Sequence, residues 1–155
     1  MSVVVRLEIL IPASPRRVYR AWLEPELLRQ WLAPEGLQVD RLEIEPRVGG
    51  RLRVWHTDSQ VDVGGFDVEI LELIPEKRLV FRWGFVWPAR DRGPRYDSLL
   101  TITLREAPGG ATWLTLVHER LEALAAAMPE VAASARVGWE GALRKLSVLL
   151  SEVKS

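Results

Sequence analysis

The sequence predicts an α+β domain in which one long C-terminal helix lies across a curved antiparallel sheet. Three observations indicate this architecture: a helical apolar pattern near the C-terminus, a long strand-and-turn pattern before it, and two short helical segments that begin at prolines. The expected order of elements is therefore one strand, two helices, six strands and one helix.

The C-terminal segment carries apolar residues at the three-to-four spacing of a single buried helix face. These residues are Ala135, Trp139, Ala142, Leu143, Leu146, Leu149, Leu150 and Val153. Pro129 and Glu130 precede all of them and suit a first helical turn, where proline fits the backbone and an acidic side chain meets the positive end of the helix dipole. The indole of Trp139, near the middle of this helix, would lie over whatever the sheet encloses.

The rest of the chain divides into short elements. Residues 3–11 alternate between apolar and other side chains, which is the period of a strand with one buried face. Ser14 and Pro15 then predict a helix start, and Pro25 predicts a second short helix. Glycine pairs and prolines separate the six remaining strands. We expect these strands near residues 37–45, 51–57, 63–73, 78–87, 96–106 and 112–120.

The composition of the 155 residues predicts a single domain over residues 1–155, with enough apolar content to bury a core. Lys and Arg balance Asp and Glu at 21 each, so no net positive field favours nucleic acid. Cysteine is absent, which fits the cytoplasm, and neither a signal peptide nor a membrane span is predicted. The absence of asparagine and the many arginines favour a thermophile, although a GC-rich genome would give the same arginine bias.

Six segments together are similar to one protein family. They are SPRRVYRAW at 14–22, PELLRQW at 25–31, PRVGGRLR at 46–53, LELIPEKRLVF at 71–81, LTLVH at 114–118 and GWEGAL at 138–143. They resemble the branch of the SRPBCC (START and birch-pollen-allergen-like) superfamily that is named for the activator of heat-shock protein 90 ATPase. The resemblance covers nearly the whole chain and implies the helix-grip fold, in which a curved sheet holds the long helix.

A row of large apolar side chains marks a candidate ligand site on one face of a single strand. The row consists of Leu79, Phe81, Trp83, Phe85 and Trp87. Such a row is either core or pocket lining, and its last three members, if they face the C-terminal helix, would form a flat-walled chamber for a ring-bearing or lipid-like ligand. The predicted ligand-binding residues are Trp83, Phe85, Trp87, His118, Trp139 and Leu143.

His118 is the strongest polar candidate, because alternation places it on the same inward face as Leu114 and Leu116. It could orient a ligand or act as a base near neutral pH, or it could simply be satisfied by a neighbouring strand or a buried water. His56 could also look inward. The two histidines lack the spacing of a metal site, so we predict no metal and no cofactor, and no catalytic motif assigns a catalytic residue.

The expected function is the binding of a small hydrophobic or aromatic molecule between the sheet and the C-terminal helix. One alternative is a protein-interaction module, a monomer or homodimer, related to chaperone ATPase activation or stress response. A second alternative is a hydrolase or cyclase of low activity that uses His118, so enzymatic activity stays open while binding is favoured. Trp55 and Trp113 alternate away from the interior and, if exposed, would mark a partner or homodimer contact.

Overall fold

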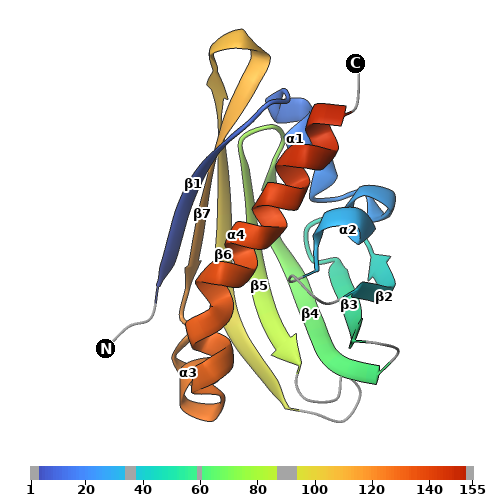
Figure 1. Ribbon diagram of the computed structural model, residues 1–155, viewed down its shortest axis with the longest axis vertical. Coiled ribbons are helices and arrows are strands. Elements are labelled where there is room, and N and C mark those ends of the chain that lie inside the picture. Colours follow the sequence, from blue (N-terminus) through green and yellow to red (C-terminus); the bar gives the residue numbers. More distant parts are fainter. Residues whose placement is uncertain (1–3, 34–37, 59–60, 87–93, 153–155) are drawn as a thin grey trace.

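The computed structural model describes residues 4–33, 38–58, 61–86 and 94–152. The elements are β1 (Val5–Ile11), α1 (Pro15–Ala21), α2 (Pro25–Trp31), β2 (Gln38–Ile44), β3 (Arg51–Asp58), β4 (Val61–Ile74), β5 (Arg78–Val86), β6 (Arg95–Ala107), the 3-10 turn η1 (Pro108–Gly110), β7 (Ala111–Glu119), α3 (Glu122–Ala127) and α4 (Pro129–Glu152). The predicted α+β fold is confirmed, with α3 as an additional element (Figure 1). None of the helices within these ranges is long and apolar enough to cross a membrane.

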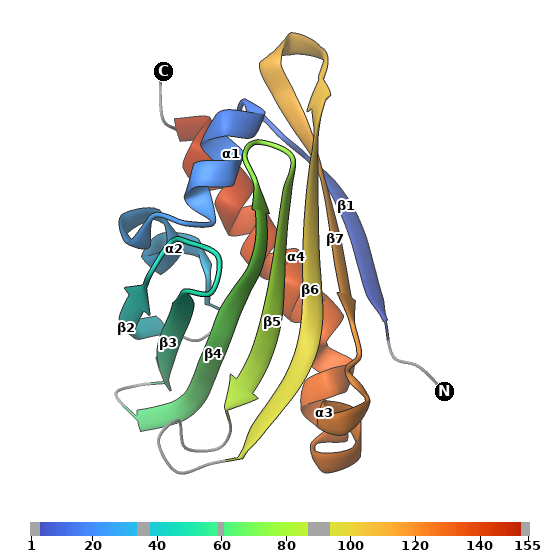
Figure 2. The ribbon, with the colours of Figure 1, turned by 180° about the vertical axis from the view of Figure 1, so that it is seen from behind.

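All seven strands belong to one antiparallel sheet with the order β1-β7-β6-β5-β4-β3-β2. The strands from β2 to β7 follow one another as the meander that the glycine and proline signals predict. β1 adds the outer edge by pairing with β7, where Val5 lies opposite His118. The sheet curves around α4, which crosses one face, and the reverse view shows the other face without a covering helix (Figures 1 and 2).

The first two helices fix the C-terminal half of α4 over the sheet. α1 begins as predicted: Ser14 Oγ accepts a hydrogen bond from the Arg17 amide at 3.3 Å, and Pro15 occupies the first turn. The Arg17 guanidinium donates to the Leu150 carbonyl at 2.7 Å, which ties α1 to the end of α4. The residues after α2 are tied to α4 by Lys145 Nζ, which donates to the Ala33 carbonyl at 2.8 Å.

The short helix α3 was not predicted. Arg120, with a φ of 61°, turns the chain sharply at the end of β7. The alanine-rich segment that follows has a high helix propensity, but no proline or capping side chain marks its start. Burial of Leu121 and Leu124 holds α3 against the molecule, next to the N-terminal end of α4.

Large aromatic side chains fill the space beneath α1 and α2. Trp22 meets Trp31 edge to face with 4.6 Å between ring centroids, and it stacks on Phe81 at 6.0 Å. Trp31 Nε1 donates to the Ala21 carbonyl at 3.0 Å, so this buried indole is satisfied. The core is therefore densely packed on the side of α1 and α2.

Candidate functional site

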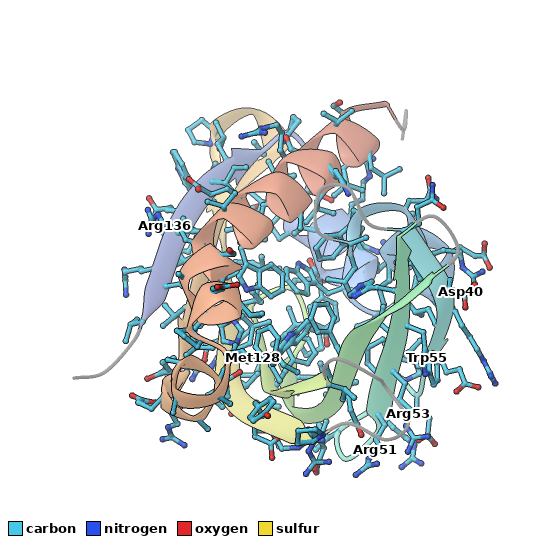
Figure 3. All side chains as sticks on the ribbon, turned by 60° about the horizontal axis from the view of Figure 1, so that its bottom comes forward. Asp40, Arg51, Arg53, Trp55, Met128 and Arg136 are labelled. Carbon is cyan, nitrogen blue, oxygen red and sulfur yellow. The ribbon has the colours of Figure 1, made fainter. Side chains whose placement is uncertain are left out.

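A cavity of about 330 Å³ lies between the sheet and the N-terminal half of α4. Figure 3 views the molecule from this end and shows side chains of the helix and the sheet projecting into the space between them. The lining comes from α4, β3, β4, β5 and the residues that follow α2. It includes Leu32, Phe66, Trp83, Phe85, Val131 and Trp139. The volume lies at the lower end of the range of roughly 300–1,000 Å³ for small-molecule pockets, which suits a compact molecule of one or two rings.

The aromatic row on β5 divides between core and cavity. Leu79 and Phe81 are fully buried in the packed half, whereas Trp83 and Phe85, further along the same face, line the cavity. Phe66 on β4 continues this wall, with its ring centroid 4.9 Å from that of Trp83 and 5.7 Å from that of Phe85. The fifth member of the row, Trp87, lies outside the described residues.

Helix α4 supplies the opposite wall through Trp139 and Gly138. The Trp139 ring meets Trp83 nearly edge to face at 5.3 Å, so the two indoles form one corner of the cavity. Gly138 lies inside the helix, where glycine costs roughly 1 kcal/mol relative to alanine. A Cβ atom at Gly138 would have no heavy atom within 4 Å, so the missing side chain leaves open space on the cavity wall.

His118 lies directly behind this wall and is completely buried. Trp139 Nε1 donates to His118 Nδ1 at 2.9 Å, and Ser98 Oγ lies 2.6 Å from His118 Nε2. Because the indole can only donate, Nδ1 accepts and the neutral ring carries its proton on Nε2. That N–H donates to Ser98 Oγ, whose own hydrogen goes to the Trp83 carbonyl at 2.8 Å.

Burial lowers the pKa of His118 from 6.5 to about 3. The ring of Phe85 stacks on the imidazole at 5.6 Å and keeps the surroundings apolar. Both ring nitrogens therefore have partners within the protein, and neither is free to meet a ligand. His118 positions the Trp139 ring rather than presenting a base to the cavity.

His56 on β3 reaches the cavity from the other side and is only 2% exposed. The register of β3 against β4 shifts between Trp55 and Thr57, and such a bulge changes the direction of the side chains within it. Opposite the shift, Gly65 has no room for a side chain, since a Cβ there would lie 1.9 Å from the Val54 carbonyl oxygen. His56 continues the inward face of the buried residues Leu52 and Val54, and this alternation places it on the lining.

The environment of His56 leaves one ring nitrogen without a partner. The pKa of His56 is lowered from 6.5 to about 4, mainly by burial. The positive charge of Lys145 lowers this pKa further, whereas a hydrogen bond with the Leu32 backbone raises it. Nε2 has no hydrogen-bond partner among the described residues. His56 is thus neutral at pH 7, with Nε2 unpaired.

The structure brings together only part of the predicted site. Trp83, Phe85 and Trp139 share the cavity, and His118 lies behind it. Leu143 is buried next to Ala142 but is absent from the lining among the described residues, because it points into the packed core. Sequence reasoning missed the wall formed by Leu32, Ala33, Gly65 and Phe66, for which only the Gly64–Gly65 pair gave a local signal.

Two tryptophans were expected to alternate away from the interior. Trp55 belongs to neither the hydrophobic core nor the cavity lining among the described residues, yet it is only 8% exposed. The Arg41 guanidinium lies 5.0 Å from its ring centroid, and Figure 3 shows Trp55 on β3 near Arg53. Trp113 is half-buried. Neither tryptophan is the fully exposed contact that a partner surface would need.

The cavity contains few charged or polar groups. Glu130 and Ser134 lie on its lining and are exposed, so they belong to its open side. Within the part of the chain that the structure describes, no three His, Asp or Glu side chains come together as a metal site. The geometry therefore suits non-covalent binding of an apolar molecule.

Solved structures with the same architecture place the chain among known proteins. Protein CV1439 from Chromobacterium violaceum is 30% identical with a TM-score of 0.79, and the match covers 97% of this chain and 99% of that one. DynU16, a protein of the dynemicin biosynthetic locus, is 26% identical with a TM-score of 0.67, over 97% of this chain and 48% of that one.

The AHSA1 protein SPO3351 from Silicibacter pomeroyi shares the fold at 22% identity and a TM-score of 0.75, with 96% and 97% of the two chains covered. No curated protein matches the chain significantly. The family model described as "Activator of Hsp90 ATPase homolog 1-like protein" matches residues 12–151. The chain therefore belongs to the AHSA1 family, with the SRPBCC helix-grip fold that its sequence motifs predict.

Proposed function

We propose that the chain binds a small hydrophobic or aromatic molecule non-covalently in the cavity between the sheet and α4. The observation that carries this proposal is the cavity itself, whose walls include the rings of Phe66, Trp83, Phe85 and Trp139. Removing about 200 Å² of apolar ligand surface from water would contribute about 5 kcal/mol at 25 cal/mol per Å². Such a surface area is reasonable for one or two rings, so the site needs no covalent bond.

Two other observations support a small-molecule ligand. Gly138 keeps the cavity open at a cost to helix stability, which is understandable if the space is used. In addition, DynU16, which is 26% identical, belongs to a biosynthetic locus and hence to a setting of small-molecule chemistry.

The alternative of a chaperone-related interaction module rests on the description of the family. The two tryptophans expected to mark its surface are buried or half-buried. A hydrolase or cyclase based on His118 has less support, because both nitrogens of that ring are already hydrogen-bonded inside the protein.

The first experiment is to purify the protein gently, record its native mass, and search for small molecules released on denaturation. A Gly138→Leu variant provides the matched test, because its side chain can enter the cavity without meeting protein atoms at Cβ. Val137→Leu adds apolar volume to the neighbouring position, which is 66% exposed, and serves as the control.

We expect a stoichiometric apolar companion with the wild type and Val137→Leu but not with Gly138→Leu. A companion that Gly138→Leu retains would contradict the cavity as its site. A clean apo mass, also for protein from its own source cells, would favour the interaction module.

A further inference from the structure

Strand β1 forms an outer edge of the sheet, and no described element lies beyond it (Figures 1 and 2). It pairs with β7 in one continuous antiparallel register from Val5 to Ile11, without a bulge. A regular edge of this kind presents a row of backbone N–H and C=O groups that another strand can pair with. β1 can therefore accept a further strand.

The carbonyl of Arg6 shows which backbone groups of β1 face outwards. The Arg136 guanidinium of α4 donates to it at 3.2 Å, so this carbonyl points away from β7, and Figure 3 shows Arg136 beside β1. A carbonyl has two lone pairs, so this bond leaves it able to accept a second N–H. The N–H and C=O of one residue point to the same side, and that side alternates along an antiparallel strand. Arg6 and Glu8 therefore direct their backbone groups outwards, whereas Leu7 directs its groups to β7.

The outward side of β1 is complementary to an antiparallel second copy of the same strand. When Leu7 lies opposite Leu7 of the second copy, each Arg6 lies opposite a Glu8, and two ion pairs can form. The same register sets Val4 opposite Leu10, which are 53% and 47% exposed in the single chain. Charged side chains thus meet opposite charges, and exposed apolar side chains meet each other.

Neighbouring registers lack this match. An axis at Arg6 sets two guanidinium groups opposite each other, and an axis at Glu8 does the same with two carboxylates. A shift of the pairing by one residue sets outward-facing backbone groups against groups that are directed to β7. The charges and the hydrogen-bonding pattern therefore select the register centred on Leu7.

The opposite edge of the sheet, β2, is less suited to pairing. Its register against β3 shifts between Val39 and Arg41, and such a bulge disrupts the row of backbone groups at an edge. Arg41 and Glu43 repeat the charge pattern of β1, but a self-pairing based on them would set Asp40 opposite Ile44. β1 is therefore the favoured edge, and β2 supplies a control.

We propose that two copies of the chain associate through β1, antiparallel and centred on Leu7, so that their two seven-stranded sheets become continuous. In the single chain Arg105 and Thr115 hold the Glu8 carboxylate at 3.4 and 3.2 Å, which orders it for Arg6 of the second copy. A contact one strand wide is small beside the roughly 1,200–2,000 Å² of stable complexes, so this dimer dissociates on dilution. The inference does not depend on ligand binding in the cavity.

A single cysteine can report the register, because the chain has none of its own. Directly opposite residues of a non-hydrogen-bonded antiparallel pair have Cα atoms about 4.5 Å apart, within reach of a disulfide. Leu7→Cys should therefore give a disulfide-linked dimer under mild oxidation. Ile9→Cys is the matched control, since Ile9 is also half-buried on β1. Its two copies would lie about 13 Å apart along the strands and should stay unlinked.

Sedimentation of the protein up to about 0.5 mM measures the association, and charge reversal tests its ion pairs. Arg6→Glu and Glu8→Arg each set like charges opposite one another, so each should weaken self-association about tenfold. A mixture of these two variants should associate again, because each chain then meets opposite charges on the other. Arg41→Glu reverses a charge on β2 and should associate as the wild type does.

A wild type that stays monomeric up to about 0.5 mM would overturn the inference, and this measurement does not depend on the folding of any variant. Absence of the Leu7→Cys disulfide, or equal cross-linking of Leu7→Cys and Ile9→Cys, would also overturn it. The same holds if Arg6→Glu weakens the dimer no more than Arg41→Glu, or if the two charge variants fail to associate when mixed. None of these results bears on the proposed binding of a small molecule.

Discussion

Trp139 on α4 donates its indole hydrogen to His118 Nδ1 on β7 across 2.9 Å, and both side chains are buried. The bonds continue from His118 to Ser98 on β6 and from Ser98 to the Trp83 carbonyl on β5. This chain of hydrogen bonds joins the long helix to three neighbouring strands immediately behind the cavity. It therefore holds the Trp139 ring in one orientation on the cavity wall.

Trp139→Phe should destabilise the protein by about 1–3 kcal/mol, because it removes the donor and leaves His118 Nδ1 buried without a partner. The measurement is the free energy of unfolding in urea. Trp113→Phe is the matched control, since it makes the same chemical change at a half-buried position of β7 and should cost less. If Trp139→Phe were as stable as the wild type, this hydrogen bond would make no net contribution to the free energy of unfolding.

Acid should destabilise the protein through its two histidines. Burial lowers the pKa of His118 to about 3 and that of His56 to about 4, both below the value of 6.5 for an unfolded chain. Between pH 6.5 and these folded values the unfolded state binds more protons, so the free energy of unfolding falls as the pH falls. At about 1.4 kcal/mol per pKa unit, the two groups together remove on the order of 5 kcal/mol by pH 4.5.

The measurement is urea unfolding at several pH values from 7.5 to 4.5. His56→Asn and His118→Asn should each flatten the dependence on pH, whatever they do to stability at pH 7.5. Glu140→Gln, at an exposed position of α4, should leave the slope unchanged. A wild-type stability that stays constant over this range would contradict the neutral, buried state of both rings.

The strands were predictable because each depends on a local pattern. In an antiparallel meander the neighbour in sequence is the neighbour in space, so turn signals and alternation suffice to order β2 to β7. The same alternation correctly placed Trp83 and Phe85 on one face. Helix α3 was not predicted because its alanines favour a helix without marking where it begins or ends.

The details of the site depend on geometry that no local pattern contains. The helical pattern placed Ala142 and Leu143 on one buried face, but the path of α4 across the sheet decides that Ala142 meets the cavity and Leu143 the core. Alternation along β3 predicts that His56 shares the inward face of Leu52 and Val54, but only the structure shows that His56 lies on the cavity lining. The hydrogen-bond partners of His118 come from elements far apart in the chain, so only the structure reveals that both of its ring nitrogens are hydrogen-bonded.

Lys145→Met should raise the pKa of His56 towards 6.5, because the nearby ammonium group adds to the effect of burial in disfavouring the charged imidazole. Burial remains, so the pKa should stay below that of an exposed histidine. The measurement is an NMR titration of the His56 ring. Arg144→Met removes the same charge from the adjacent exposed position and should shift the pKa less. Equal shifts in the two variants would mean that net charge, rather than the position of Lys145, sets the effect.

Replacing either of two glycines on the cavity lining by alanine should change stability, and the two substitutions should act in opposite directions. Gly138→Ala should raise the free energy of unfolding by about 0.5–1 kcal/mol, since it improves helix propensity and its Cβ meets no atom within 4 Å. Gly65→Ala should lower it, because its Cβ would lie 1.9 Å from the Val54 carbonyl oxygen and force β3 and β4 apart. Urea unfolding of the two variants measures both effects. A destabilised Gly138→Ala would mean that the space beside the helix is closed in solution, and with it the cavity on which ligand binding depends.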